Sequence, residues 1–168
     1  MSNRSRNSNM TRITREFQKL TQSIDSDDGP EGIHKVELVN GEIKRWNVYI
    51  KMRDRRDLHK DLKRVNHGYI ILRVRFDDEY PLKPPKVVVH SPILKGKFIM
   101  RGGGICIDTL SDKYWSPVMS MESVIVTVRS VIKEMDELSV EGSGKYDEQE
   151  AISAWERAMN KHGWNHDQ

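Results

Sequence analysis

The side chain in this chain best suited to nucleophilic chemistry is that of Cys106, the only cysteine among the 168 residues. A thiol becomes a usable nucleophile near neutral pH once a fraction of it is ionised to the thiolate, and its ordinary pKa is about 8.5. Gly102, Gly103 and Gly104 precede it closely and permit backbone angles that other residues avoid. A lone cysteine is more often a small buried apolar side chain than a nucleophile, so the surrounding sequence has to decide.

The composition predicts one soluble globular domain. Charged residues make up 32% and hydrophobic residues 36%, with a mean hydropathy of −0.70. No apolar run approaches the length of a membrane span, and no signal peptide opens the chain, so no membrane contact is expected. The net charge of +3 is too small to indicate nucleic-acid binding. A single cysteine fits a reducing compartment, so we expect a cytoplasmic or nuclear location, or both.

The N-terminal third contains a tail and a helix. Residues 1–9 are Ser, Asn and Arg without apolar periodicity, which predicts a disordered tail, followed by a single domain over residues 10–168. From Met10 to Ile24 the apolar residues fall on one helical stripe. The basic residues off that stripe give the predicted helix a cationic outer face: Arg12, Arg15 and Lys19.

Strands follow. Asn40-Gly41 is a strong signal for a type I′ hairpin turn, because both central residues of that turn need positive φ. It joins a strand over 36–39 to a longer one, and further strands are predicted over 69–76 and 86–90. In the third strand the alternation puts Arg73 and Arg75 outward.

Between the second and third strands lies a charged insertion, residues 51–67. Its apolar residues Leu58, Leu62 and Val65 are spaced for a short amphipathic helix. A solvated helix face is the default interpretation of its charges, and a docking patch is the second.

The cysteine lies in a long connection. A rigid proline turn over 80–85 precedes the fourth strand, and residues 91–105 show little periodicity, which predicts a loop. A central buried helix is expected over 121–135, with Ser120 as its cap, followed by an acidic loop over 136–145. Asp147 and Glu150 have the spacing of a capping box that opens a last helix.

Three motifs carry a family resemblance: Tyr80-Pro81-Leu82-Lys83-Pro84-Pro85, the Gly-x-Ile-Cys-x-Asp-x-Leu segment from Gly103 to Leu110, and Trp115-Ser116-Pro117. In this order and spacing they resemble the ubiquitin-conjugating enzyme family. The resemblance implies an α+β fold with an N-terminal helix, a four-stranded antiparallel meander, an active-site loop, a central helix and a C-terminal helix. The segments that resemble the family's Q-type branch are Trp46-Asn47-Val48, residues 58–62, the glycine triplet, residues 121–125 and residues 162–164.

One motif of the family is missing. Most members have His-Pro-Asn shortly before the cysteine, and here those positions hold Gly96, Lys97 and Phe98. The family's asparagine is thought to steady the loop and the oxyanion that forms when an amine attacks the thioester. Backbone N–H groups of the glycine triplet are one hypothesis for replacement donors.

The resemblance implies that Cys106 accepts the C-terminal glycine of ubiquitin or a ubiquitin-like protein from an activating enzyme, as a thioester. The glycine triplet then either lets that extended tail pass close to the backbone or forms a flexible loop. Asp108 fits a local backbone cap better than a base, and Tyr114 and Ser116 either line the groove or pack structurally. Relatives keep an acid after the central helix, for which this sequence offers three candidates: Asp136, Glu137 and Glu141.

The partners that the resemblance implies are ubiquitin or a ubiquitin-like protein, the ubiquitin-activating enzyme and a ubiquitin ligase. The protein itself is expected to be a monomer without metal or cofactor. Mapped by motif, Leu82 and Pro117 would face the ligase, and the helix contacts would be Arg12, Arg15 and Lys19.

Two other classes of protein stay open. One is a non-catalytic interaction module related to this family, although such proteins generally lose the cysteine. The other is the RWD-type domain, which lacks a cysteine in a Gly-x-Ile-Cys frame. A cysteine protease is disfavoured because the six histidines show no known protease signature.

Overall fold

The computed structural model describes residues 3–25 and 30–164, and its antiparallel sheet with flanking helices confirms the α+β class. The helices are α1 (Asn3–Asp25), α2 (Arg56–Asn66), α3 (Met121–Glu134) and α4 (Glu148–Trp164), with a 3-10 turn, η1, at Asp108–Leu110. The strands are β1 (Ile33–Val39), β2 (Glu42–Lys51), β3 (Tyr69–Arg75), β4 (Lys86–Ser91), β5 (Ile93–Lys95) and β6 (Ser139–Gly142). No described helix is long and apolar enough to cross a membrane.

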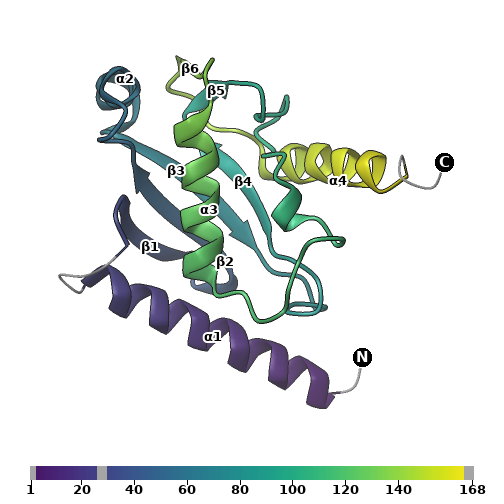
Figure 1. Ribbon diagram of the computed structural model, residues 1–168. Coiled ribbons are helices and arrows are strands. Elements are labelled where there is room, and N and C mark those ends of the chain that lie inside the picture. Colours follow the sequence, from purple (N-terminus) through teal and green to yellow (C-terminus); the bar gives the residue numbers. More distant parts are fainter. Residues whose placement is uncertain (1–2, 26–29, 165–168) are drawn as a thin grey trace.

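The sheet follows chain order, β1-β2-β3-β4, which is the predicted meander. At the Asn40-Gly41 turn φ is 52° and 73°, so the type I′ geometry is confirmed. The register sets Trp46 opposite Val74, and both side chains are fully buried. Alternate residues of the central strands therefore face the core, which lies between the sheet and α3 (Figure 1).

The helix caps expected from sequence are present. The Ser120 side chain accepts a hydrogen bond from the Ser123 N–H at 3.1 Å, at the start of α3. At the start of α4 the Asp147 carboxylate accepts one from the Glu150 N–H at 2.8 Å. These caps fix where the two C-terminal helices begin, and so how they lie against the cysteine loop.

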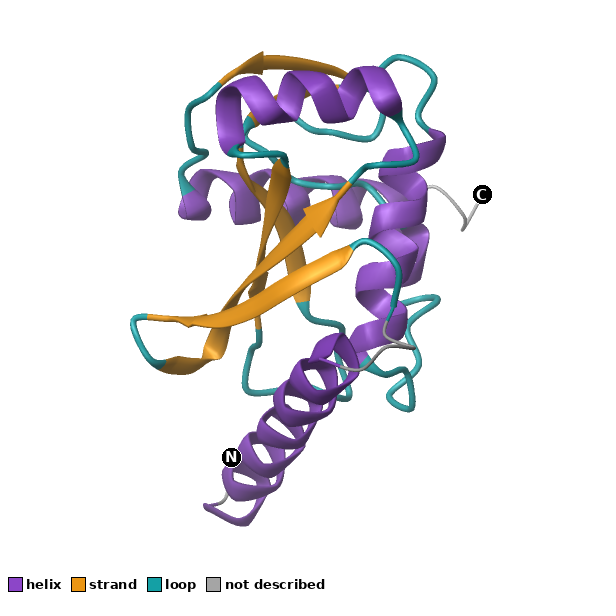
Figure 2. Cartoon of the chain, turned by 90° about the vertical axis from the view of Figure 1, so that its left-hand side faces the viewer, coloured by secondary structure: helices purple, strands orange, loops and turns teal. Residues whose placement is uncertain are grey.

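The predicted tail over residues 1–9 is wrong for the part that the structure describes. α1 already begins at Asn3 and projects beyond the sheet (Figure 2). Asn9 is only 3% exposed, and its side-chain amide donates to the backbone carbonyls of Asp77 and Tyr80. These partners are about 70 residues away in sequence, so the composition of the segment gave no sign of them.

Two segments predicted as loops contain strands. β5, within the 91–105 connection, pairs antiparallel with β6 from the 136–145 segment. Leu94 in β5 is 4% exposed, so this small sheet adds to the core. Each strand is too short to show an alternation in sequence, and only their pairing stabilises them.

Arg73, expected to point outward into solvent, is instead buried under the start of α4. Its guanidinium pairs with the Glu148 carboxylate, which also accepts from Arg45 at 2.7 Å. Burial alone would raise the pKa of Glu148, but hydrogen bonds from Arg45 and the charge of Arg73 hold it below its ordinary value of 4.5. This network joins α4 to the outer face of β2 and β3.

We expect Glu148→Gln to destabilise the fold by about 3 kcal/mol, because it leaves the buried Arg73 charge uncompensated. The stabilisation by the carboxylate is complete above pH 4.5 and is lost as pH falls through the lowered pKa of the folded state. Urea unfolding at pH 7 and pH 3 measures both effects. Glu42→Gln, which removes an exposed partner of Arg45, is the control and should cost less than about 1 kcal/mol. Equal losses from the two variants would contradict a special role for Glu148.

Candidate active site

The segment before Cys106 is held by main-chain hydrogen bonds on both sides. On one side the Val89 N–H of β4 donates to the Gly103 carbonyl at 2.7 Å. On the other the Cys106 N–H donates to the Phe98 carbonyl at 2.9 Å, and Ile99 forms a β-bridge with Ile105. The cysteine therefore follows a fixed, strand-like segment rather than a flexible one.

Backbone angles and close packing both favour glycine within the triplet. Gly102 and Gly103 have φ of +98° and +95°, a region that favours glycine. A Cβ on Gly103 would lie 2.7 Å from the ring of Tyr146 and 2.8 Å from the Val89 carbonyl. Gly103 and Gly104 are buried, so they provide no open path for a protein tail.

One backbone donor of the triplet, the Gly103 N–H, is already hydrogen-bonded within the loop. It donates to the Met100 carbonyl at 2.9 Å and points into the loop's own structure. The Cys106 N–H is likewise engaged by Phe98.

The Cys106 thiol is partly exposed, between the buried side chains of Ile105 and Ile107. That exposure distinguishes Cys106 from a fully buried apolar cysteine. Burial, and then the negative charge of Asp108, raise the pKa of the thiol above its ordinary value. Most of the thiol is therefore protonated at neutral pH, so a reaction at sulfur must remove the proton.

Replacing Asp108 by Asn is expected to speed the alkylation of Cys106 by iodoacetamide at pH 7.5. A raised pKa leaves less thiolate at that pH, and removing the Asp108 charge lowers the pKa and increases the thiolate fraction. Asp112→Asn is the matched control, because that exposed carboxylate is not among the groups that raise the pKa. A rate that stays the same in Asp108→Asn would show that burial alone sets the pKa.

Asp108 itself opens η1, and its backbone carbonyl accepts from the Ser111 N–H at 2.9 Å. This bond is the turn's own main-chain hydrogen bond; no side-chain hydrogen bond from a described residue caps the start of η1, and Asp108 is exposed. The three later acids are not among the charges that shift the pKa of Cys106 within the described residues. Glu141 accepts from Ser139, and the Glu137 carbonyl lies beside Gly96.

Of the other predicted loop residues, Phe98 contacts the cysteine through its backbone, and the residue is 38% exposed. Tyr114 is 56% exposed. Ser116 is half-buried, and its carbonyl accepts from the Met119 N–H at 3.0 Å, which is a structural contact.

The proline turn and the Trp-Ser-Pro loop are joined by the indole of Trp115, which donates to the Pro81 carbonyl at 2.7 Å. Beside this bond Leu82 is 78% exposed and Pro117 is exposed. Val118, at 85% exposed, adds to the same apolar surface. It was missed because nothing in the sequence distinguishes it from a core valine.

On α1, Arg15 and Lys19 are exposed, as expected of helix contacts. Arg12 differs: it is partly buried and donates to Glu16 at 3.0 Å and to the Met119 carbonyl at 3.2 Å. The bond to Met119 joins α1 to the segment before α3, so Arg12 serves the fold.

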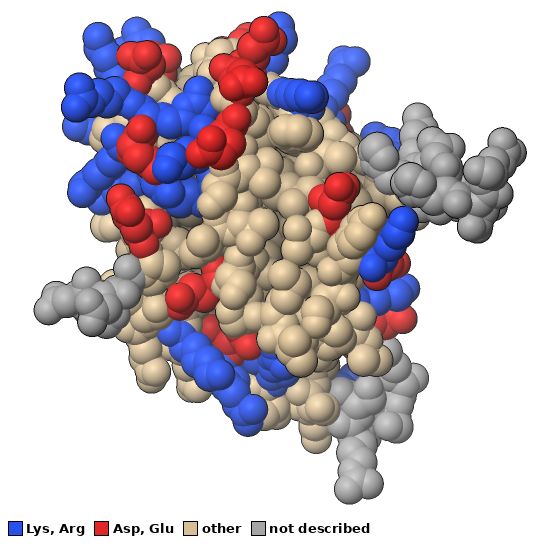
Figure 3. Space-filling view, in the orientation of Figure 1, with Lys and Arg blue, Asp and Glu red and all other residues tan. Residues whose placement is uncertain are grey.

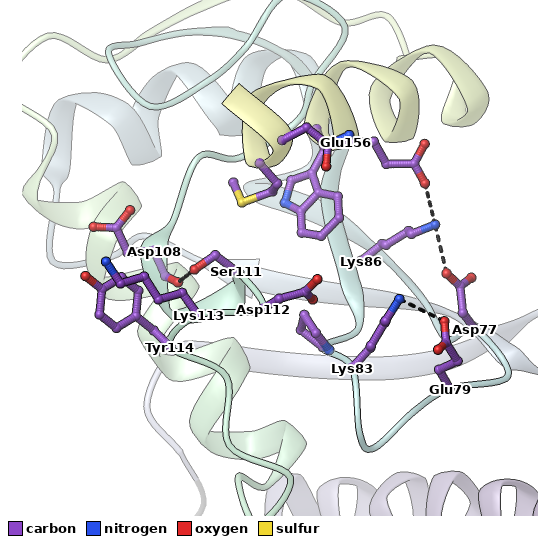
Figure 4. Close-up of a pocket in the computed structure, with 14 residues that line it drawn as sticks. Asp77, Glu79, Lys83, Lys86, Asp108, Ser111, Asp112, Lys113, Tyr114 and Glu156 are labelled. Carbon is purple, nitrogen blue, oxygen red and sulfur yellow. Dashed lines mark hydrogen bonds and ion pairs between the residues drawn. The ribbon is translucent and has the colours of Figure 1, made fainter. Parts of the chain in front are cut away.

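A pocket of about 680 Å³ lies between the proline turn, the segment after the cysteine and α4 (Figure 4). Asp108, Ser111 and Tyr114 line it from one side. On the other side Lys86 is held between Asp77 at 2.8 Å and Glu156 at 2.6 Å. The contribution of α4 could not be predicted, because it depends on where that helix docks. Among the described residues no three His, Cys, Asp or Glu side chains are grouped to hold a metal ion.

Comparison with known protein families shows which family the chain belongs to. The sequence profile of the family described as ubiquitin-conjugating enzyme matches residues 12–150. The chain belongs to the ubiquitin-conjugating enzyme family.

Its relatives confirm the resemblance to the Q-type branch. The chain is 37% identical over 106 residues to ubiquitin-conjugating enzyme E2 Q1 of Homo sapiens, covering 60% of this chain and 25% of that protein. It is 25% identical over 160 residues to a Q-like ubiquitin-conjugating enzyme protein of Drosophila melanogaster, covering 91% of this chain and 51% of that one. The chain thus spans from a quarter to about half the length of these relatives.

The fold comparison agrees. A crystal structure of a ubiquitin conjugating enzyme E2 from Plasmodium falciparum superposes with a TM-score of 0.57 and 22% sequence identity. The match covers 76% of this chain and 85% of that one, and at this identity it shows the shared fold alone.

Proposed function

We propose that this ubiquitin-conjugating enzyme family protein carries ubiquitin, or a ubiquitin-like protein, as a thioester on Cys106 and transfers it onward. The observation that supports this best is the partly exposed thiol at the end of a segment fixed by hydrogen bonds. A covalent carrier divides one difficult transfer into two easier ones, and the sulfur must be accessible in both.

In the first step the Cys106 sulfur, having lost its proton, attacks the carbonyl carbon of the C-terminal glycine held by the activating enzyme. A C–S bond to Cys106 forms, and the activating enzyme's cysteine leaves as a thiolate. In the second step an acceptor amine, hydroxyl or thiol attacks the same carbon, and Cys106 leaves with the electron pair. The raised pKa of Cys106 favours attack by sulfur once deprotonated but makes it a poorer leaving group.

The proposed partners are ubiquitin or a ubiquitin-like protein, its activating enzyme and a ligase. The protein would act as a monomer in the cytoplasm or nucleus. The exposed Arg15 and Lys19 on α1 would face the activating enzyme. The ligase would meet the apolar surface of Leu82, Pro117 and Val118.

Leu82→Ala is expected to slow ligase-stimulated discharge several-fold while the melting temperature stays near wild type, because the side chain is 78% exposed. Leu94→Ala is the contrast: this leucine is 4% exposed, and its truncation should cost about 2–5 kcal/mol of stability. A large loss of stability from Leu82→Ala would place that side chain in the core instead.

The proposal is tested by incubating the protein with activating enzyme, ATP and ubiquitin, and comparing gels with and without reductant. We expect an adduct that reductant removes and that Cys106→Ala does not form. Cys106→Ser is expected to give a reductant-resistant oxyester. Wild-type protein without an adduct would favour the non-catalytic interaction module, and an adduct on Cys106→Ala would exclude this cysteine as the carrier.

A further inference from the structure

The insertion between β2 and β3 concentrates the positive charge of the protein. Seven basic and three acidic side chains lie between Lys51 and Arg64, whereas the whole chain has a net charge of only +3. Figure 3 shows Lys and Arg side chains gathered over α2, at the upper left. The rest of the molecule carries nearly balanced charge, so the insertion is its distinctive electrostatic feature.

The acids of the insertion are mostly occupied elsewhere. Asp54 pairs with Arg129 at 2.8 Å and with Lys133 at 3.2 Å, both on α3. Asp61 pairs with Arg64. Only Asp57 is left to offset the remaining cations of the insertion, within the part of the chain that the structure describes.

One basic residue of the insertion serves the fold. The Arg55 guanidinium donates to three carbonyls at the end of α3, the shortest being that of Met135 at 2.7 Å. α2 itself is anchored by Leu58 and Leu62, which are 5% and 0% exposed. The helix is therefore a fixed support, and its outward residues are free of these structural tasks.

Three of those outward residues form a row. Arg56, Lys60 and Lys63 are exposed and lie on the side of α2 opposite Leu58 and Leu62. Arg56 and Lys63 are seven positions apart, which is about 10 Å along the helix axis. At about 100° per residue, the three side chains lie within an arc of about 60° around that axis. Exposed Arg53 lies just before the helix, and no ion pair of these four cations is found among the described residues.

Neighbouring groups show that positive charge accumulates here. Burial, followed by the charges of Lys63, Arg53 and Lys51, lowers the pKa of His59. Burial and the charge of Arg53 also lower the pKa of Lys51. These residues are close enough to repel one another, so an anionic partner would relieve that repulsion.

The aromatic residues nearby favour a peptide over a nucleic acid. Single-stranded nucleic acids bind where open aromatic rings stack on bases. Here Tyr69 is already stacked by His34 at 4.9 Å, with the Lys51 ammonium 5.4 Å from its centroid. Tyr49 is covered by Lys35 at 5.1 Å. The rings serve the protein's own packing, which leaves charge as the means of recognition.

We propose that the α2 surface, defined by Arg53, Arg56, Lys60 and Lys63, binds an acidic peptide segment of a partner protein. An extended peptide places every second side chain on one face, about 6–7 Å apart. Carboxylates at alternate positions would therefore match the spacing of this row. The surface is formed by the insertion rather than by the cysteine loop, so binding here is independent of the thioester chemistry.

The test uses the full chain with Cys106→Ala and a fluorescein-labelled peptide, acetyl-Gly-Asp-Ser-Asp-Ser-Asp-Gly-amide, followed by fluorescence anisotropy. The triple reversal Arg56→Glu, Lys60→Glu and Lys63→Glu should raise the Kd at least tenfold. The matched control reverses three other exposed cations, Lys95→Glu, Lys145→Glu and Arg157→Glu, and should change it less than twofold. Melting temperatures check folding, and if the triple variant is unstable, Lys60→Gln and Lys63→Gln should each weaken binding alone.

Three results would overturn the proposal. The first is an equal loss of affinity in the control reversal, which would mean that net charge alone attracts the peptide. The second is equal binding of the same peptide with Asn in place of Asp. The third is tighter binding of a twelve-nucleotide uridine RNA than of the peptide, which would identify a nucleic-acid site.

Discussion

Discharge of the charged protein onto free lysine is expected to be about a hundred- to a thousandfold slower than from a family member that keeps the asparagine, which is the cost of losing one oxyanion donor elsewhere. Phe98 stands eight positions before Cys106, where the family has that residue, and a phenyl ring donates no hydrogen bond. The main chain does not compensate at Gly103 or Cys106, because both N–H groups already donate to carbonyls within the loop.

The measurement is single-turnover discharge of purified thioester, side by side with a relative that has the asparagine. Charging should be affected much less, since the activating enzyme helps to organise the first transfer. A cysteine or hydroxyl acceptor, or a ligase that completes the site, should restore a fast rate. Ligase-free lysine discharge as fast as that of the relative would make the missing side chain irrelevant.

Gly103→Ala is expected to destabilise the fold by about 3 kcal/mol, which corresponds to a fall of about 6–12 °C in melting temperature. The new methyl would meet the Tyr146 ring at 2.7 Å, in a backbone region that alanine disfavours. The ring cannot easily move aside, because its hydroxyl donates to the Leu94 carbonyl and accepts from the Leu94 N–H.

Gly41→Ala separates the two causes of that loss. Gly41 also has positive φ, +73°, but nothing lies within 4 Å of its Cβ position. Its substitution therefore measures the backbone cost alone, about 1 kcal/mol. Thermal unfolding of the two variants gives the difference. If both lose the same stability, Tyr146 has moved aside and the packing claim is wrong.

Signals confined to a few neighbouring residues predicted their structures correctly. The Asn40-Gly41 turn and the caps at Ser120 and Asp147 need only local hydrogen bonds and local backbone angles. The proline turn and the cysteine motif identified the family for the same reason, since each is a contiguous stretch.

Features that depend on distant partners could not be predicted. Asn9 is buried by contacts with the proline turn, and Arg73 is buried by packing against the start of α4. The role of Gly103 is decided by Tyr146, which sequence analysis had no reason to place beside it. Alternation and composition describe a segment by itself, so they indicate ordinary surface or loop residues at all three positions.

The contact between Gly103 and Tyr146 also constrains how the family can diverge. A side chain at position 103 becomes sterically acceptable only after the ring at position 146 has been lost, and losing the ring first would leave a void beside the cysteine loop. Either single step is costly, so the two positions should change together or not at all. Among Q-type sequences, an aromatic residue here and the middle glycine of the triplet are therefore expected to be inherited as a pair.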